Sequence, residues 1–201
     1  MGVSIKGLRL VRSEEGSPAG EEAQQMADMQ RPPDSLAYIK PRGAGETDAW
    51  SEEARQRGGQ RLAEVAEVIP PQEVATALHL SLNEKAAVRR RVILLDGDVI
   101  ELADSYYPLQ IARGTALTEK RKIKGGAPTL LAELGYQPRR VAEDLEFRSA
   151  SESERTALAL PEGAAVLTLL RTTSTEDGSP YEVQLMVMKA PRRLHYEIEV
   201  D

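Results

Sequence analysis

The sequence has no cysteine, one phenylalanine, one tryptophan and two histidines among its 201 residues. The lack of cysteine excludes disulfide scaffolds, cysteine-ligated zinc and thiol catalysis. No run approaches the roughly 20 consecutive apolar residues of a membrane span, and the first residues lack the apolar segment of a secretory signal. We therefore expect a cytoplasmic protein with no membrane partner. With so few aromatic residues, the core should rest on leucine, valine, isoleucine and alanine.

Motifs for nucleotide binding and for common catalytic sites are also missing. There is no Walker A motif, no Gly-x-Gly-x-x-Gly after a strand, and no Gly-x-Ser-x-Gly turn that would present a nucleophilic serine. His79 and His195 stand far apart, without an acidic motif at metal-ligand spacing. We therefore predict no metal, no cofactor and no enzymatic activity.

The charge balance bears on the partners of the protein. The chain carries 26 Lys and Arg against 32 Asp and Glu, which gives a net charge of −6. Non-specific DNA binding comes mostly from basic side chains that neutralise phosphates, so we do not expect this acidic chain to bind DNA directly.

The N-terminal region differs in composition from the rest. Residues 1–37 are rich in Gly, Pro, Glu and Gln and cannot bury enough apolar surface to offset their ordering entropy, so we predict a disordered tail followed by a domain over residues 38–201. Asp48 or Ser51 can cap a short helix that Gly58-Gly59 would end.

From residue 61 the pattern predicts the order strand, helix, strand, strand, helix, strand, helix, strand, strand. The clearest signal is a hairpin of residues 87–95 and 99–107 around Asp96-Gly97-Asp98. Ser151-x-x-Glu154 is a capping box that opens a helix. This order predicts an α+β fold with a central antiparallel sheet flanked by helices.

Arginine is concentrated on otherwise apolar strand sequence, at positions 89–91 and at Arg171. Because strand side chains alternate between faces, Arg89 and Arg91 should project from one face and Arg90 from the other. A guanidinium on a sheet can grip a carboxylate or phosphate. The alternative is a solvated face or structural ion pairs with Glu101, Asp104, Asp144 or Glu182.

Two aromatic positions are further candidates. Trp50-Ser51 could offer helix N–H groups and a flat indole wall to an anion, or could simply be an N-cap beside a packing residue. Tyr106-Tyr107, before Pro108, either pack in the core or bind a ligand, and such a pair packs more often than it binds.

Several segments, taken in order, resemble the UTRA effector-binding domain of GntR-type transcription regulators of the HutC subgroup. The resemblance runs from about residue 38 to the C-terminus. It rests on Pro70–Ala75, Leu95–Val99, Asp104–Pro108, Gly126–Leu131, Ser151–Leu167, Leu170–Thr173 and Asp177–Glu182.

This resemblance implies a chorismate lyase-like fold that binds a small, usually anionic metabolite and commonly forms a homodimer. Carried onto the matching positions, it gives Trp50, Ser51, Arg91 and Glu182 as ligand-binding residues, and we add Arg89 and Tyr106 as candidates. Some positions depart from members that bind phosphorylated amino sugars, so we expect a less charged, more apolar ligand. The departures are Ile93, Ala103, Gly126, Pro128 and Met188.

Such regulators carry an N-terminal winged helix-turn-helix, whereas only about 37 residues precede the resemblance here. We therefore expect a stand-alone effector domain or a shortened gene product, which would reach DNA only through a fused or partner winged helix-turn-helix. Two alternatives are a chorismate lyase-like enzyme and a ligand-free dimerisation partner of full-length regulators.

Overall fold

The computed structural model describes residues 39–41, 57–192, 194 and 196. The predicted tail over residues 1–37 and most of the predicted helix over residues 48–59 lie outside these residues. The sequence of residues 196–200 is also compatible with an edge strand, and most of that segment lies outside them too. Gly58 and Gly59 do not end a helix but begin strand β1 (Gly58–Val68), where they pair with Leu95 and Leu94.

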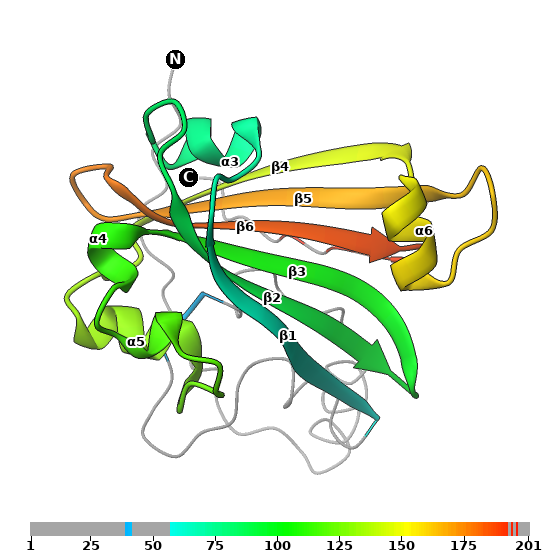
Figure 1. The fold of residues 1–201 in the computed structure, drawn as a ribbon, viewed down its shortest axis with the longest axis horizontal. Helices are drawn as coiled ribbons and strands as arrows, with labels where there is room; N and C mark the ends of the chain where they lie inside the picture. The colour runs from blue at the N-terminus through cyan, green and yellow to red at the C-terminus, as the bar shows by residue number, and fades with distance from the viewer. Residues whose placement is uncertain (1–38, 42–56, 193, 195, 197–201) are drawn as a thin grey trace, which may run out of the picture. The chain divides into compact units, whose positions relative to one another are not determined.

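Six antiparallel strands form one sheet, as the sequence predicted (Figure 1). Across the sheet the order is β1-β2-β3-β6-β5-β4, and every neighbouring pair is antiparallel. The α+β prediction is therefore confirmed. After β1, the strands are β2 (Ala86–Leu95), β3 (Asp98–Pro108), β4 (Arg140–Ser149), β5 (Ala165–Ser174) and β6 (Pro180–Lys189).

The hairpin between β2 and β3 turns at the predicted place. Its two central residues, Asp96 and Gly97, both have positive φ, at 52° and 87°. A two-residue turn with this geometry matches the twist of the strands, and glycine adopts it at little steric cost. The turn, together with a β-bulge between Ile93 and Leu94, sets the register that places Arg89 opposite Ser105.

Helices α3 (Gln72–Ala77) and α6 (Glu152–Leu158) pack on one face of the sheet, each over an apolar cluster. The predicted capping box opens α6, since the Glu154 backbone N–H donates to Ser151 Oγ and the Ser151 N–H donates to the Glu154 carboxylate. The cluster at α3 contains Val74, Leu78, Ala86, Val88, Tyr106 and Val183, and the cluster at α6 contains Ala150, Leu158, Val166 and Val187.

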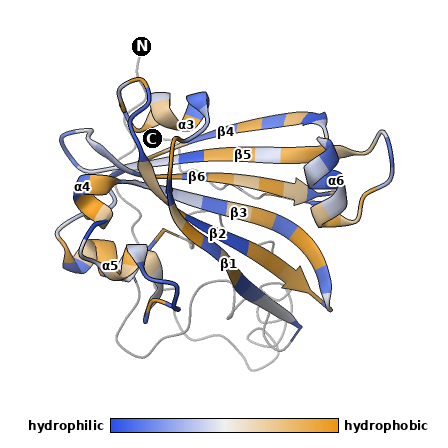
Figure 2. Ribbon diagram, viewed as in Figure 1, coloured by the Kyte–Doolittle hydropathy of each residue, from blue (hydrophilic) through white to orange (hydrophobic). Residues whose placement is uncertain are grey.

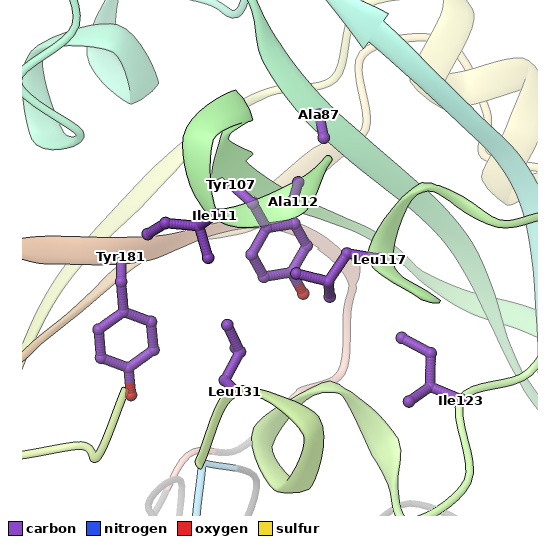
Figure 3. Packing of buried hydrophobic residues seen from close by; sticks show 8 residues of the cluster. All are labelled: Ala87, Tyr107, Ile111, Ala112, Leu117, Ile123, Leu131 and Tyr181. Atoms are coloured by element: carbon purple, nitrogen blue, oxygen red, sulfur yellow. The ribbon is translucent and has the colours of Figure 1, made fainter. Parts of the chain in front are cut away.

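The opposite face is covered at one end by α4 (Leu109–Ala112), a single 3₁₀ turn η2 (Ala116–Thr118) and α5 (Gly126–Glu133). The sequence predicted α5 but neither α4 nor η2. These elements surround the ring of Tyr107 (Figure 3). The cluster consists of Ala87, Tyr107, Ile111, Ala112, Leu117, Ile123, Leu131 and Tyr181.

Strand β4 is an edge of the described sheet and is more polar than the central strands (Figure 2). It carries Glu143, Asp144, Glu146 and Arg148, and the side chain of Phe147 is 67% exposed. Among the described strands it pairs only with β5.

Candidate ligand-binding site

A cavity of about 130 Å³ lies between the sheet and the segment that leads into α5. The strands of the sheet form one wall of the cavity, and the segment that leads into α5 forms the other. The sheet wall consists of Gln60, Leu62, Arg89, Arg91, Ser105 and Tyr107, and the loop wall consists of Lys122, Ile123, Gly126 and Ala127. The sheet residues share a face because antiparallel partners lie directly opposite each other, as Leu62 does with Arg91.

Arg91 is the candidate anion contact on the sheet wall. It is partly buried, and its Nη2 donates to Ser105 Oγ at 2.8 Å. The buried Ser105 oxygen also accepts from Gln184 Nε2 at 3.3 Å. These contacts fix one side of the guanidinium, and its other N–H groups make no hydrogen bond within the described part of the chain. They are therefore available to a carboxylate or phosphate.

Glu182 lies behind this wall and does not line the cavity. Its Oε1 accepts from the Tyr107 hydroxyl at 2.7 Å and from Gln184 Nε2 at 3.4 Å. Burial raises the pKa of Glu182, while the Tyr107 hydrogen bond and the charge of Arg91 oppose the rise. Burial also raises the pKa of Tyr107 well above 10, so its phenol stays protonated and donates. Glu182 therefore acts on the cavity indirectly, through Tyr107 and, by way of Gln184, through Ser105.

Arg89 lines the cavity but is already engaged by the backbone. Its Nη1 donates to the carbonyl oxygens of Ala116, Leu117 and Glu119 at 3.1, 3.0 and 2.8 Å, and its Nη2 donates to that of Arg121 at 2.8 Å. A guanidinium with four such acceptors has little capacity left for a ligand. The observed role of Arg89 is to hold the segment from η2 to Arg121 against β2.

Arg90 projects from the other face, as predicted. It forms ion pairs with Glu64 and with Asp104, the latter at 3.1 Å. Tyr106 shares this face: its ring packs in the α3 cluster and its hydroxyl donates to Asp104 Oδ2 at 3.2 Å. The structure thus places Tyr106 outside the cavity, and its neighbour Tyr107 stands on the cavity side.

The ion pairs considered as an alternative are distributed differently from the prediction. Of the four acids, Asp104 pairs with Arg90, and Glu101 accepts from Arg192 at 3.4 Å. The buried Arg171 pairs with Glu143 and donates to Gln184 Oε1 at 3.1 Å. Trp50 and Ser51 lie outside the described residues, so their ligand-binding role stays a prediction.

Sequence reasoning missed several cavity residues, although two signals pointed to them. Ser105 and Tyr107 alternate along β3 and lie on the same face of the sheet as Arg89 and Arg91, and Tyr107 was already a candidate as part of the Tyr106-Tyr107 pair. The run of basic residues from Lys120 to Lys124 is visible in the sequence. Gln60 and Leu62 gave no signal beyond a strand pattern.

Over residues 39–41, 57–192, 194 and 196, no three His, Cys, Asp or Glu side chains are grouped so that they could hold a metal ion. No helix in the same residues is long and apolar enough to cross a membrane.

Residues 54–192 match the family model of the UTRA domain. The chain belongs to the UTRA domain family. A relative is an uncharacterised HTH-type transcriptional regulator of Streptomyces coelicolor, 28% identical over 139 residues that cover 68% of this chain and 52% of the relative. The chain therefore spans about half the length of the curated relative that it matches.

Solved structures agree with this UTRA assignment at the level of the fold. A protein assigned to the GntR family of transcriptional regulators is 24% identical with a TM-score of 0.67, covering 90% of this chain and 80% of that one. The effector domain of PhnF from Mycobacterium smegmatis is 17% identical with a TM-score of 0.62, and the match covers 80% of this chain and 99% of that domain. The ligand-binding domain of a GntR-family protein from Bordetella bronchiseptica is 23% identical with a TM-score of 0.58, and the match covers 72% of this chain and 92% of that domain. The predicted chorismate lyase-like fold of GntR effector domains is thus confirmed.

Proposed function

We propose that this UTRA domain senses a small anionic or polar metabolite on behalf of a GntR-type transcription regulator of the HutC subgroup. One observation carries the proposal. Arg91 stands on the wall of the cavity, fixed by Ser105 Oγ, and its other N–H groups make no hydrogen bond to any described residue and could bind an anion. Arg89, two residues away on the same face, donates to four backbone carbonyls instead.

The other lining residues favour a ligand with an apolar body. Leu62, Ile123 and Ala127 contribute aliphatic surface to both walls of the cavity. Burial of that surface would supply much of the binding free energy, while Arg91 would orient the acidic group.

We further propose that the domain forms a homodimer in the cytoplasm and reaches DNA only through a fused or partner winged helix-turn-helix. Membership of the UTRA family and the HTH-type relative support this part of the proposal. The proposed activity is binding, without catalysis and without a cofactor.

The ligand site can be tested with hexanoate, a monoanion with a short apolar body, followed by calorimetry and by the amide NMR signals of Ser105, Ile123 and Ala127. We expect Arg91→Ala to weaken binding about tenfold or more, because a charge-assisted hydrogen bond is lost. Arg90→Ala is the matched control, since it removes the same side chain from the opposite face and should leave the affinity unchanged.

Equal affinities in the wild type and Arg91→Ala would remove Arg91 from the site. If neither hexanoate nor the dianion adipate shifts these amides at tens of millimolar, the cavity is not the effector site. A native mass spectrum tests the remaining part, with a dimer expected and a monomer at all concentrations contradicting the proposed assembly.

A further inference from the structure

The hydroxyl groups that line the sheet wall of the cavity are already engaged by the protein. Ser105 Oγ accepts from Arg91 Nη2 at 2.8 Å and from Gln184 Nε2 at 3.3 Å. The Tyr107 hydroxyl donates to Glu182 Oε1 at 2.7 Å. Both hydroxyl oxygens therefore belong to the network beneath the wall and offer little to a ligand.

Gln60 differs from these lining residues. It lies on β1, is partly buried and lines the cavity. Its side-chain amide makes no hydrogen bond to any residue that the structure describes. An amide has two N–H donors and a carbonyl acceptor. A ligand that fills the cavity takes water away from this amide, and the unpaired amide then weakens binding unless the ligand itself offers a hydrogen-bonding group.

The register of β1 against β2 places Gln60 near Arg91. Leu62 lies directly opposite Arg91, and Gln60 is two residues before Leu62 on the same face. Diagonal neighbours across an antiparallel pair are about 7–8 Å apart, which is within reach of two long side chains. A ligand whose acid group is bound by Arg91 therefore brings the atoms next to that acid close to the Gln60 amide.

The charges of the cavity favour one kind of group beside the acid. Arg89 and Arg91 place two guanidinium groups on the sheet wall, and no carboxylate of a described residue lines the cavity. An ammonium group at this place would meet like charge. A hydroxyl carries no charge, and it can both accept from Gln60 Nε2 and donate to Oε1. The cavity thus favours a hydroxyl over an amine.

We propose that the effector is a hydroxy acid whose acid group is bound by Arg91 and whose hydroxyl, close to that acid, is bound by Gln60. Its apolar body packs against Leu62, Ile123 and Ala127. The inference rests on the proposed function, because it takes the cavity as the effector site. It adds Gln60 as a residue that determines specificity.

Four probes with the same six-carbon chain test this proposal: hexanoate, 2-hydroxyhexanoate, 6-hydroxyhexanoate and 2-aminohexanoate. Their affinities are measured by calorimetry on the wild type and on Gln60→Met, which keeps the length of the side chain and removes the amide. The control variant is Gln72→Met, which removes the same amide from an exposed position of α3 outside the cavity lining.

We expect the wild type to bind the better enantiomer of 2-hydroxyhexanoate about fivefold more tightly than hexanoate, as one net hydrogen bond provides. The hydroxyl of 6-hydroxyhexanoate is too far from the acid and should give no gain, and 2-aminohexanoate should bind more weakly than hexanoate. In Gln60→Met the gain should disappear while hexanoate binding stays constant, which also shows that this variant is folded. Gln72→Met should keep the gain.

Equal binding of hexanoate and 2-hydroxyhexanoate by the wild type would overturn the Gln60 contact while leaving the cavity as the effector site. A parallel loss of both probes in Gln60→Met would overturn it too, because the amide would then bind the carboxylate itself. Binding of none of the four probes would instead count against the proposed function.

The two enantiomers of 2-hydroxyhexanoate provide a readout that solvation of the hydroxyl cannot change. Arg91, Gln60 and the apolar lining are three contacts held by the fold, so the enantiomers should differ several-fold in affinity for the wild type. They should become equal in Gln60→Met. Equal binding of the enantiomers by the wild type would contradict a fixed contact at Gln60.

Discussion

The two faces of the sheet are built from the same strands but hold different chemistry. The face under α3 and α6 buries two apolar clusters, and its charges, such as Arg90 with Asp104, are partly exposed ion pairs. The other face buries Arg89, Arg171, Glu182 and Gln184. Burying such groups costs free energy unless each one is hydrogen-bonded.

This difference indicates which face is under functional demand. An apolar face would stabilise the same sheet with fewer constraints, and buried charges are often replaceable by apolar residues without loss of stability. A connected polar network beneath a cavity is instead what binding a polar ligand requires. We therefore expect the first face to carry stability and the second to carry the site.

The largest expected effect is on the apolar face. Leu158 is the last residue of α6 and is fully buried. Its replacement by alanine should lower the free energy of unfolding by about 2–4 kcal/mol. Urea unfolding followed by circular dichroism measures this loss. Hexanoate affinity of the folded variant should not change, and a clear loss of affinity would show that the two faces are not separate.

Arg89→Met tests the clamp on the opposite face. The substitution leaves four backbone carbonyls without their charged donor, so we expect the free energy of unfolding to fall by about 2–3 kcal/mol. Hydrogen exchange should accelerate at the amides of Thr118, Glu119 and Gly126, which are hydrogen-bonded in this segment.

Arg90→Met is the control for Arg89→Met on the other face of the sheet. Because the ion pairs of Arg90 are partly exposed, their removal should lower the free energy of unfolding by no more than about 1 kcal/mol. Unchanged exchange in Arg89→Met would show that the loop is held by its apolar anchors alone.

Glu182→Gln should change how stability depends on pH. Below the ordinary carboxyl pKa of 4.5 the side chain is protonated in both states. Because burial raises the pKa in the folded state, the unfolded state ionises first as the pH rises, and the wild type loses stability. The variant lacks this loss and retains an oxygen acceptor for Tyr107. Urea midpoints should therefore favour the variant increasingly from pH 4.5 to pH 8, and a difference that is constant with pH would contradict the raised pKa.

The smallest expected effect is a gain in the free energy of unfolding. Thr173 is buried on β5, and its hydroxyl has no hydrogen-bond partner among the described residues. Thr173→Val keeps the shape and should stabilise the domain by about 0.5–1 kcal/mol. Thr168→Val on the same strand is the control, because the Thr168 hydroxyl donates to the Glu146 carbonyl and its removal should destabilise. If urea unfolding shows that both substitutions change the free energy of unfolding in the same direction, the Thr173 hydroxyl is not the unsatisfied group.

Local signals in the sequence predicted most of the fold. The β2–β3 hairpin follows from a turn that accepts positive φ, and α6 follows from a capping box, because both depend on residues that are near neighbours in the chain. The elements that were missed, α4 and η2, are three or four residues long and show no periodicity. They are stabilised by packing around Tyr107, which no local pattern reveals.

The site was harder to predict because its contacts are distant in the sequence. Alternation correctly separated Arg90 from Arg89 and Arg91. It could not show that Arg89 donates to carbonyls 27 to 32 positions away. The choice between Tyr106 and Tyr107 depends on the register of β3 against β2. That register is set by the two-residue turn together with the bulge between Ile93 and Leu94, and the sequence pattern does not reveal the bulge.

The edge strand β4 bears on how the protein behaves at high concentration. An outer strand with open backbone groups can recruit a strand from another molecule, and the exposed ring of Phe147 would favour such growth. Five of the ten residues of β4 are charged, three acidic and two basic, so a strand that paired with this edge would have to desolvate charges along its length. Charged residues on an edge strand act in this way as gatekeepers against fibre formation.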